Sequence, residues 1–416
     1  MAGESFRFIH ASDFHLEHPP GDLDLLPAHL RDALATAPFK AASAVFDAAM
    51  AENIDFLVLA GDLLHPATAG PRGISLLLNH FEQLHQRKKP VFWAAGNVDD
   101  AARWPEAVPL PPNVTLFPKN RTLSIPVQRA GRTICQVIGR SSEGRTELHV
   151  PSYRVDPTDE FTVAIGYGSA DAESLAEGRM DYWALGGEHQ RQEIDGGGSA
   201  GAMYCGTPQG RSLLEAGTHG YTLIDIDSER NARIHGVDCD SFRYFQVEVD
   251  AAEIAAAGNI RSVLSSRIAR LLHENGSRHL ILGWDIVVSA DTLHIAGDPH
   301  ELLQWLRRDY GHGTPSAWTA KLTIRPPKNY PKNWCDEDTI LGDFLRAAQR
   351  HSKSGGRELS LGPFTEEHPG LSRSVSALLS DTAAHTRTEL LDEATRIGVE
   401  CLRGTSPAFA GQGERS

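Results

Sequence analysis

Apolar runs alternate with longer amphipathic stretches through the first half of the chain. Short continuous apolar runs predict strands that are covered on both faces, and the Ala- and Leu-rich stretches between them predict helices. The strand–helix–strand order indicates an α/β layered fold, in which ligands gather at the carboxyl ends of the strands. The strands are expected at 6–13, 54–62, 91–95, 132–139, 161–168, 181–187 and 221–227, and the helices at 28–52 and 73–87.

The pattern changes near residue 240. A strand beginning at "RYFQVEVD", a helix over about 251–276 and strands at "HLILGWDIVVS" and "AWTAKLTIRP" indicate a small α+β unit. "RPPKNYPKNW" is rich in Pro, Lys and Asn, which is typical of a linker. Beyond it we expect an amphipathic helix at 336–350, a loose segment at 352–370, a last helix at 371–403 and a disordered tail. The expected divisions are therefore 1–240, 241–326 and 327–416.

Composition narrows the class of protein. At 416 residues the chain exceeds one ordinary core. The formal net charge of −14 argues against a simple basic clamp for nucleic acid, although an acidic metal site would carry charge that its ion offsets. No apolar run reaches the ~18 residues of a membrane span, so no membrane association is expected. The five cysteines are scattered, which favours reduced thiols and a cytoplasmic protein.

Residues that can bind a metal follow successive strands of the first half. Because the carboxyl ends of parallel strands meet at one edge of a sheet, these side chains are expected to lie close together. Carboxylate, amide and imidazole groups in one cluster suit a borderline divalent metal such as Mn²⁺, Zn²⁺ or Fe²⁺. The residues are Asp13, His15, Asp62, His65, Asn97 and His189.

The motifs that carry these residues resemble a known superfamily. "HASDFHL", "AGDLLH", "DYWALGGEHQ" and "YCGTPQGRS" resemble the calcineurin-like metallophosphoesterases, and within them the SbcD-type DNA repair nucleases. "DEDTILGDFLR" and "ELLDEATRIGVECL" resemble the C-terminal part of the YhaO-like branch. The resemblance implies a layered metallophosphoesterase β-sandwich flanked by helices, a small α+β capping domain and a C-terminal helical segment. It also implies an SbcC-like coiled-coil ATPase as partner, DNA bound through that complex, and a homodimer as one state of assembly.

The resemblance further implies roles for individual residues. One metal would be held by Asp13, His15, Asp62 and His189, with Asp62 shared with a second metal. Asn97 would bind that second metal, His65 would act as a catalytic residue near the scissile phosphate, and Arg211 is a candidate phosphate contact.

Three positions depart from the family pattern, and all belong to the second-metal half of the site. Val98, Tyr167 and Gly187 stand where the family has histidines. Val98 cannot transfer a proton and Gly187 offers no side-chain ligand. Tyr167 could bind a metal only as a phenolate, which is costly from a reference pKa near ~10. One divalent ion, with Mn²⁺ the favoured candidate, is therefore expected rather than two. The alternative is that the remaining ligands now make hydrogen bonds only.

Three functions remain open from the sequence. The first is a subunit of a DNA repair nuclease with weakened or lost phosphodiesterase activity. The second is an inactive scaffold that keeps the fold and the partner helix. The third is an active exonuclease, or a phosphodiesterase for small molecules, with an altered metal site.

Overall fold

The computed structural model describes residues 4–353 and 384–402, apart from short gaps. The gaps are 19, 22–25, 67, 101–103, 106, 155, 157, 290–291, 293–294, 296–297, 326–329 and 331. Most of the segment expected to be loose, the first part of the helix expected at 371–403, and the tail after it lie outside the described residues.

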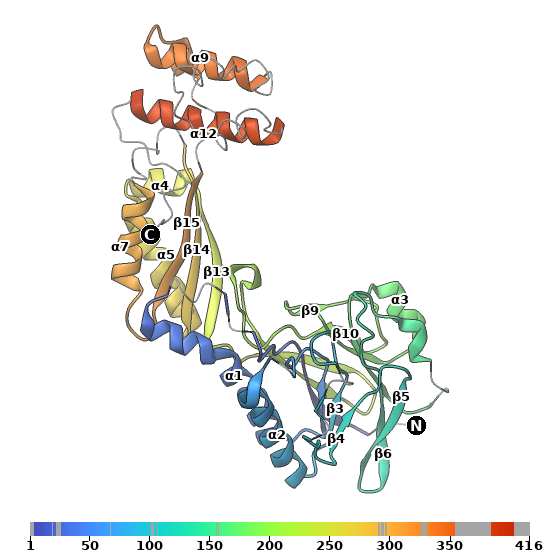
Figure 1. Ribbon diagram of the computed structural model, residues 1–416. Coiled ribbons are helices and arrows are strands. Elements are labelled where there is room, and N and C mark those ends of the chain that lie inside the picture. The colour runs from blue at the N-terminus through green and yellow to red at the C-terminus, as the bar shows by residue number, and fades with distance from the viewer. Residues whose placement is uncertain are drawn as a thin grey trace. The chain divides into compact units, whose positions relative to one another are not determined.

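Two six-stranded sheets form two layers of the fold (Figure 1). The first sheet has the order β12-β11-β1-β2-β3-β4 and the second has the order β5-β6-β7-β8-β10-β9. The first contains β1 (Phe6–Ala11), β2 (Phe56–Leu59), β3 (Val91–Trp93), β4 (Val114–Leu116), β11 (Gly220–Ile226) and β12 (Ala232–Asp238). The second contains β5 (Leu123–Arg129), β6 (Arg132–Gly139), β7 (Thr162–Tyr167), β8 (Tyr182–Gly186), β9 (Gln192–Glu193) and β10 (Gly201–Tyr204).

The two sheets enclose one apolar core and are covered by helices on their other faces. Phe8 and Phe56 of the first sheet meet Val163 and Tyr182 of the second in the core between them. The outer face of the first sheet packs against α1 (Ala28–Ala51) and α2 (Gly70–Gln86). The second sheet packs against α3 (Ala172–Glu177), which lies on the opposite side of the domain from α2 in Figure 1. The predicted α/β sandwich flanked by helices is therefore confirmed.

The strands whose ends carry the candidate site run parallel. β1 pairs with β2 and β2 with β3 in parallel, and so does β7 with β8. The polar residues that follow these strands consequently lie at one edge, as the sequence pattern predicts. The five strands that the pattern did not predict, β4, β5, β9, β10 and β12, are short or carry many exposed side chains, so their apolar signal is weak.

The chain forms two compact units. One comprises Met1–Gln246, Asn275–Leu282 and Gly313–Ala320, and the other comprises Val247–Glu274, Gly283–His312 and the residues from Lys321 onward. A three-stranded sheet has the order β13-β14-β15, with β13 at Phe242–Val249, β14 at His279–Val287 and β15 at Ala317–Arg325. The domain boundaries expected after residues 240 and 326 stay predictions.

The single helix expected over 251–276 is wrong, because the chain forms two helices there. Gly258 has a φ of 64°, which ends α4 (Ala251–Ala257) before α5 (Ile260–Asn275) begins. Glycine adopts this left-handed conformation without steric cost. A further helix, α7 (Pro299–Tyr310), was not predicted, although Asp298 caps it by accepting hydrogen bonds from the His300 and Glu301 amides.

The C-terminal helices pack against one another. α9 (Ile340–Lys353) corresponds to the helix expected at 336–350, whereas α8 (Lys332–Asp336) begins within the segment expected to be a linker. α12 (Ala384–Leu402) lies against α9. Leu345 and Val399 are buried at this contact, and a Cβ atom on Gly398 would overlap the Phe344 ring. The apolar side chains of α12 are thus partly used in packing on α9. Among the described helices, none has the length and apolar character of a transmembrane segment.

Candidate metal centre

The loops after β1 and β2 are joined by their main chains. The Asp13 amide donates to the Gly61 carbonyl at 2.9 Å, and the His15 amide donates to the Asp62 carbonyl at 3.0 Å. Asp13, His15 and Asp62 all have positive φ values, of 56°, 45° and 52°. Residues other than glycine rarely take this conformation, and residues held in it cluster at functional sites.

Three predicted ligands come together at this edge. Asp13, His15 and His189 each offer a ligand atom, and these atoms lie within 4.8 Å of one another. The Nε2 atom of His15 is 3.9 Å from Asp13 Oδ1 and 3.7 Å from Asp62 Oδ2. That nitrogen is buried and has no hydrogen-bond partner. A buried nitrogen without a partner, facing two carboxylates, fits a divalent cation between them.

A carboxylate orients each imidazole of this group. His15 Nδ1 lies 3.2 Å from Glu17 Oε1, and His189 Nδ1 lies 2.8 Å from Glu215 Oε1. Because an ionised carboxylate only accepts, Nδ1 is assigned the hydrogen in both rings, and Nε2 keeps its lone pair. Metal-binding histidines commonly have such a carboxylate behind them. The donor set therefore fits one divalent metal at Asp13, His15 and His189.

Arg211 completes the support of His189. Its Nη2 atom donates to Glu215 Oε1 at 3.1 Å, and its side chain is only 12% exposed. Burial alone would raise the pKa of Glu215, but the hydrogen bond with His189 and the charge of Arg211 lower it to about 2. The hydrogen bond with Glu215 in turn raises the pKa of His189. The phosphate contact expected of Arg211 stays a prediction, since its guanidinium here holds Glu215.

The Asp13 carboxylate is held from two sides. The Ser12 hydroxyl donates to Asp13 Oδ2 at 2.5 Å, and the Gly187 amide lies 3.2 Å from Oδ1 and 3.1 Å from Oδ2. Burial raises the pKa of Asp13 to about 6, although the electrostatic interaction with His15 and the Ser12 hydrogen bond act in the opposite direction. A bound cation would favour the ionised form of this buried carboxylate.

Asp62, the residue expected to be shared with a second metal, already has three donors. The Asn97 amide donates to its Oδ1 at 2.6 Å and the Val98 amide donates to the same atom at 2.8 Å. The Tyr167 hydroxyl donates to Oδ2 at 2.5 Å. Both carboxylate oxygens are thus engaged by the protein itself.

Tyr167 is a neutral donor in this arrangement. Burial raises its pKa, and the negative charges of Asp62 and Asp13 raise it further. Its ring lies in space left by two glycines, because a Cβ atom at Gly61 or Gly96 would come within 2.6 Å of a Tyr167 ring carbon. The phenolate needed for metal binding is therefore disfavoured, and the phenol supplies a hydrogen bond instead.

The other two departures contribute through the main chain. Gly187 has a φ of 104°, and a Cβ atom there would lie 3.3 Å from both the Gly168 nitrogen and Tyr167 Cζ. Val98 contributes the amide that binds Asp62. The exposed Asn97 side chain accepts a hydrogen bond from the Ser142 hydroxyl at 3.1 Å.

Asp99 is a site residue that the sequence reasoning missed. It is 2% exposed and accepts hydrogen bonds from four N–H groups, namely the amides of Asp62, Leu63 and Gly96 and the indole of Trp93. Burial and the nearby charge of Asp62 raise its pKa to about 7. It stands two positions after the predicted ligand Asn97, and an acidic residue so close to a predicted ligand is a signal that could have identified it. Glu17 and Glu215 were also missed, since no motif marks them.

His65 is hydrogen-bonded to Glu17, the carboxylate that orients His15. Its amide donates to Glu17 Oε2 at 3.0 Å, on the carboxylate whose other oxygen faces His15. The Nδ1 atom of His65 is buried and has no hydrogen-bond partner. The catalytic role of His65 stays a prediction.

Comparison with known proteins supports the resemblance to the calcineurin-like metallophosphoesterases. Residues 6–191 match the sequence model of the calcineurin-like phosphoesterase family. The uncharacterized metallophosphoesterase YhaO of Bacillus subtilis (strain 168) is 29% identical over 237 residues. The aligned region is 53% of this chain and 57% of YhaO, so it spans a little over half of that relative's length. YhaO is itself uncharacterized and assigns no substrate.

Proposed function

We propose that this protein is a phosphoesterase that uses one divalent ion, with Mn²⁺ the favoured candidate, because residues 6–191 match the calcineurin-like phosphoesterase family model. Asp13, His15 and His189 would hold the ion, with Asp62 beside them. One observation carries the proposal: His15 Nε2 is buried without a partner, whereas both oxygens of Asp62 are occupied by the Asn97 and Val98 amides and the Tyr167 hydroxyl.

A divalent ion in such a site polarises a phosphate and lowers the pKa of a bound water. The residues of this chain would position the ion through its ligands. Glu17 and Glu215 fix the two imidazole rings, and Ser12 and Gly187 hold Asp13. Following the resemblance, His65 is the group we propose for protonating the leaving oxygen. Two-metal sites stabilise the attacking and leaving oxygens together, so a single ion predicts slower cleavage.

We propose phosphodiesters of DNA as the substrate class, following the resemblance to SbcD-type nucleases. The chain's net charge of −14 supports DNA binding through a partner rather than through this protein alone. An SbcC-like ATPase contacting the α9–α12 pair is the proposed partner, and the surface that binds it would lie outside the Leu345–Val399 contact. The hydrogen bond from Tyr167 to Asp62 favours the second candidate, a scaffold without cleavage activity.

Hydrolysis assays separate these two functions. Purified protein is incubated with Mn²⁺ and bis(p-nitrophenyl) phosphate, and separately with single- and double-stranded DNA. Slow hydrolysis that EDTA abolishes, and that His189→Ala lowers at least tenfold, is the expected result. His235→Ala is the matched control, because His235 is exposed on β12 away from the motifs. Hydrolysis no faster than that of His189→Ala would favour the scaffold.

A further inference from the structure

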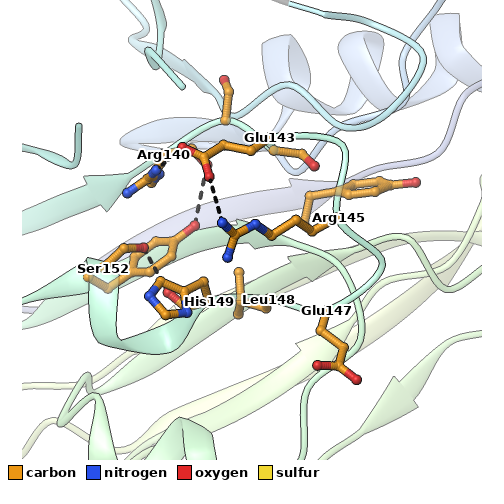
Figure 2. Close-up of a pocket in the computed structure, with 11 residues that line it drawn as sticks. Arg140, Glu143, Arg145, Glu147, Leu148, His149 and Ser152 are labelled. Carbon is orange, nitrogen blue, oxygen red and sulfur yellow. Dashed lines mark hydrogen bonds and ion pairs between the residues drawn. The ribbon is translucent and has the colours of Figure 1, made fainter. Parts of the chain in front are cut away.

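A pocket beside Tyr167 carries two arginines. It is formed largely by the segment between β6 and β7, with Arg140, Glu143, Arg145 and His149 around it (Figure 2). Tyr167, whose hydroxyl binds Asp62, also lines the pocket. Tyr167 therefore lies between the pocket and the candidate metal centre.

Hydrogen bonds attach this segment to the loop after β3. The Ser142 hydroxyl donates to Asn97 Oδ1 at 3.1 Å, and the Ser142 amide donates to the Ala95 carbonyl at 2.8 Å. These bonds hold the pocket beside Asn97, the residue expected to bind a second metal. Positive charge in the pocket consequently lies next to the half of the site that Tyr167 fills.

The two guanidinium groups share one carboxylate. Arg140 pairs with Glu143, and Arg145 Nη2 lies 3.6 Å from the other oxygen of the same side chain. The second acidic residue of the lining, Glu147, points away from the arginines in Figure 2. Glu143 is therefore the one lining carboxylate that both arginines share. Because Glu143 is 38% exposed and Arg145 61% exposed, separating that pair costs little.

We propose that this pocket binds a second phosphate of an oligonucleotide substrate, next to the phosphodiester held at the metal centre. This inference rests on the proposed function. Guanidinium groups match phosphate oxygens in a bidentate geometry, and Glu143 acts as an internal counter-ion that the phosphate displaces. The arginines would bind negative charge of the substrate, as the second metal does in two-metal sites. They would not activate water. Substrates with a neighbouring phosphate are therefore preferred over isolated diesters.

The first test measures binding without catalysis. The full-length protein is treated with EDTA and titrated with the thymidine dinucleotides pTpT and TpT, which differ by one terminal phosphate. The wild type is expected to bind pTpT more tightly, and Arg140→Gln with Arg145→Gln to bind pTpT about tenfold more weakly, with TpT unchanged. Arg145→Gln alone, on an exposed side chain, keeps the test valid if the double variant does not fold.

Two further variants sharpen the result. Glu143→Gln removes the internal counter-ion and is expected to tighten pTpT binding. Arg132→Gln removes the same charge at an 81% exposed position outside the pocket and should leave binding unchanged. Equal binding of pTpT and TpT by the wild type, or equal loss in Arg132→Gln and Arg145→Gln, would overturn the inference.

A kinetic readout distinguishes the failure of this inference from failure of the proposed function. If the protein hydrolyses both dinucleotides with Mn²⁺, the double arginine variant should raise KM for pTpT alone and leave kcat unchanged. Arginine-dependent binding without hydrolysis would support the pocket and contradict the phosphoesterase. Hydrolysis with identical KM for both dinucleotides in every variant would support the phosphoesterase and contradict the pocket.

Discussion

Removing the Tyr167 hydroxyl tests whether a phenol has taken over the role of a metal at Asp62. Tyr167→Phe keeps the ring between Gly61 and Gly96 and deletes only the donor that lies 2.5 Å from Asp62 Oδ2. A buried carboxylate then keeps the Asn97 and Val98 amides on one oxygen and loses its donor on the other. A hydrogen bond to a charged group contributes roughly 1.5–3 kcal/mol, so the metal-free protein should lose about 2 kcal/mol of unfolding free energy.

The assay is urea unfolding of EDTA-treated protein, with Tyr153→Phe as the matched control. The Tyr153 hydroxyl is also buried but donates to the neutral carbonyls of Ile165 and Arg140, at 3.0 and 3.3 Å. Its loss should cost about 1 kcal/mol, as is usual for neutral partners. If Tyr167→Phe is no more destabilising than Tyr153→Phe, the phenol does not stabilise the Asp62 charge and the reasoning is refuted.

Three other predictions concern the supports of the site and the C-terminal helices. Gly187→Ala should destabilise the fold by about 1–3 kcal/mol in thermal unfolding. Gly217→Ala should cost less, because Gly217 has a similar φ of 107° but a Cβ atom there would meet no other atom within 4 Å. Equal losses of stability in the two variants would count against crowding of residue 187 by Tyr167. Glu215→Gln should weaken Mn²⁺ binding 10- to 100-fold in calorimetry, with Glu229→Gln, at an exposed position, unchanged. Deleting residues 365–416 removes α12 and should abolish co-purification with an SbcC-like ATPase while residues 4–240 stay folded by protease resistance; retained co-purification would contradict the proposed partner surface.

The strands and helices that position the site could be predicted from apolar patterning. β2, β3, β7 and β8 are continuous buried runs, and β1 is buried at every position except Arg7, so their signal is strong and their ends mark the ligands. The break at Gly258 was missed because a single glycine is tolerated within a helical pattern, and only its φ of 64° shows that the helix ends.

The candidate site was predictable in its residue types but not in its hydrogen bonding. The sequence indicates that Val98, Tyr167 and Gly187 cannot act as histidines. It does not indicate that the Val98 and Gly187 amides bind Asp62 and Asp13, because main-chain donors are set by backbone conformation rather than by residue type. Glu17 and Glu215 were likewise found only in the structure, since each is brought to its histidine by the local course of a loop.

The measurement that tests the central claim most directly is the number of metal ions per chain. Crystals grown with excess Mn²⁺ would be examined by anomalous scattering, with elemental analysis of the same protein in solution. One fully occupied ion bound by Asp13, His15 and His189, with the Tyr167 hydroxyl still on Asp62, is the predicted result. Two fully occupied ions, with Tyr167 displaced from Asp62 or bound to metal, would contradict the account.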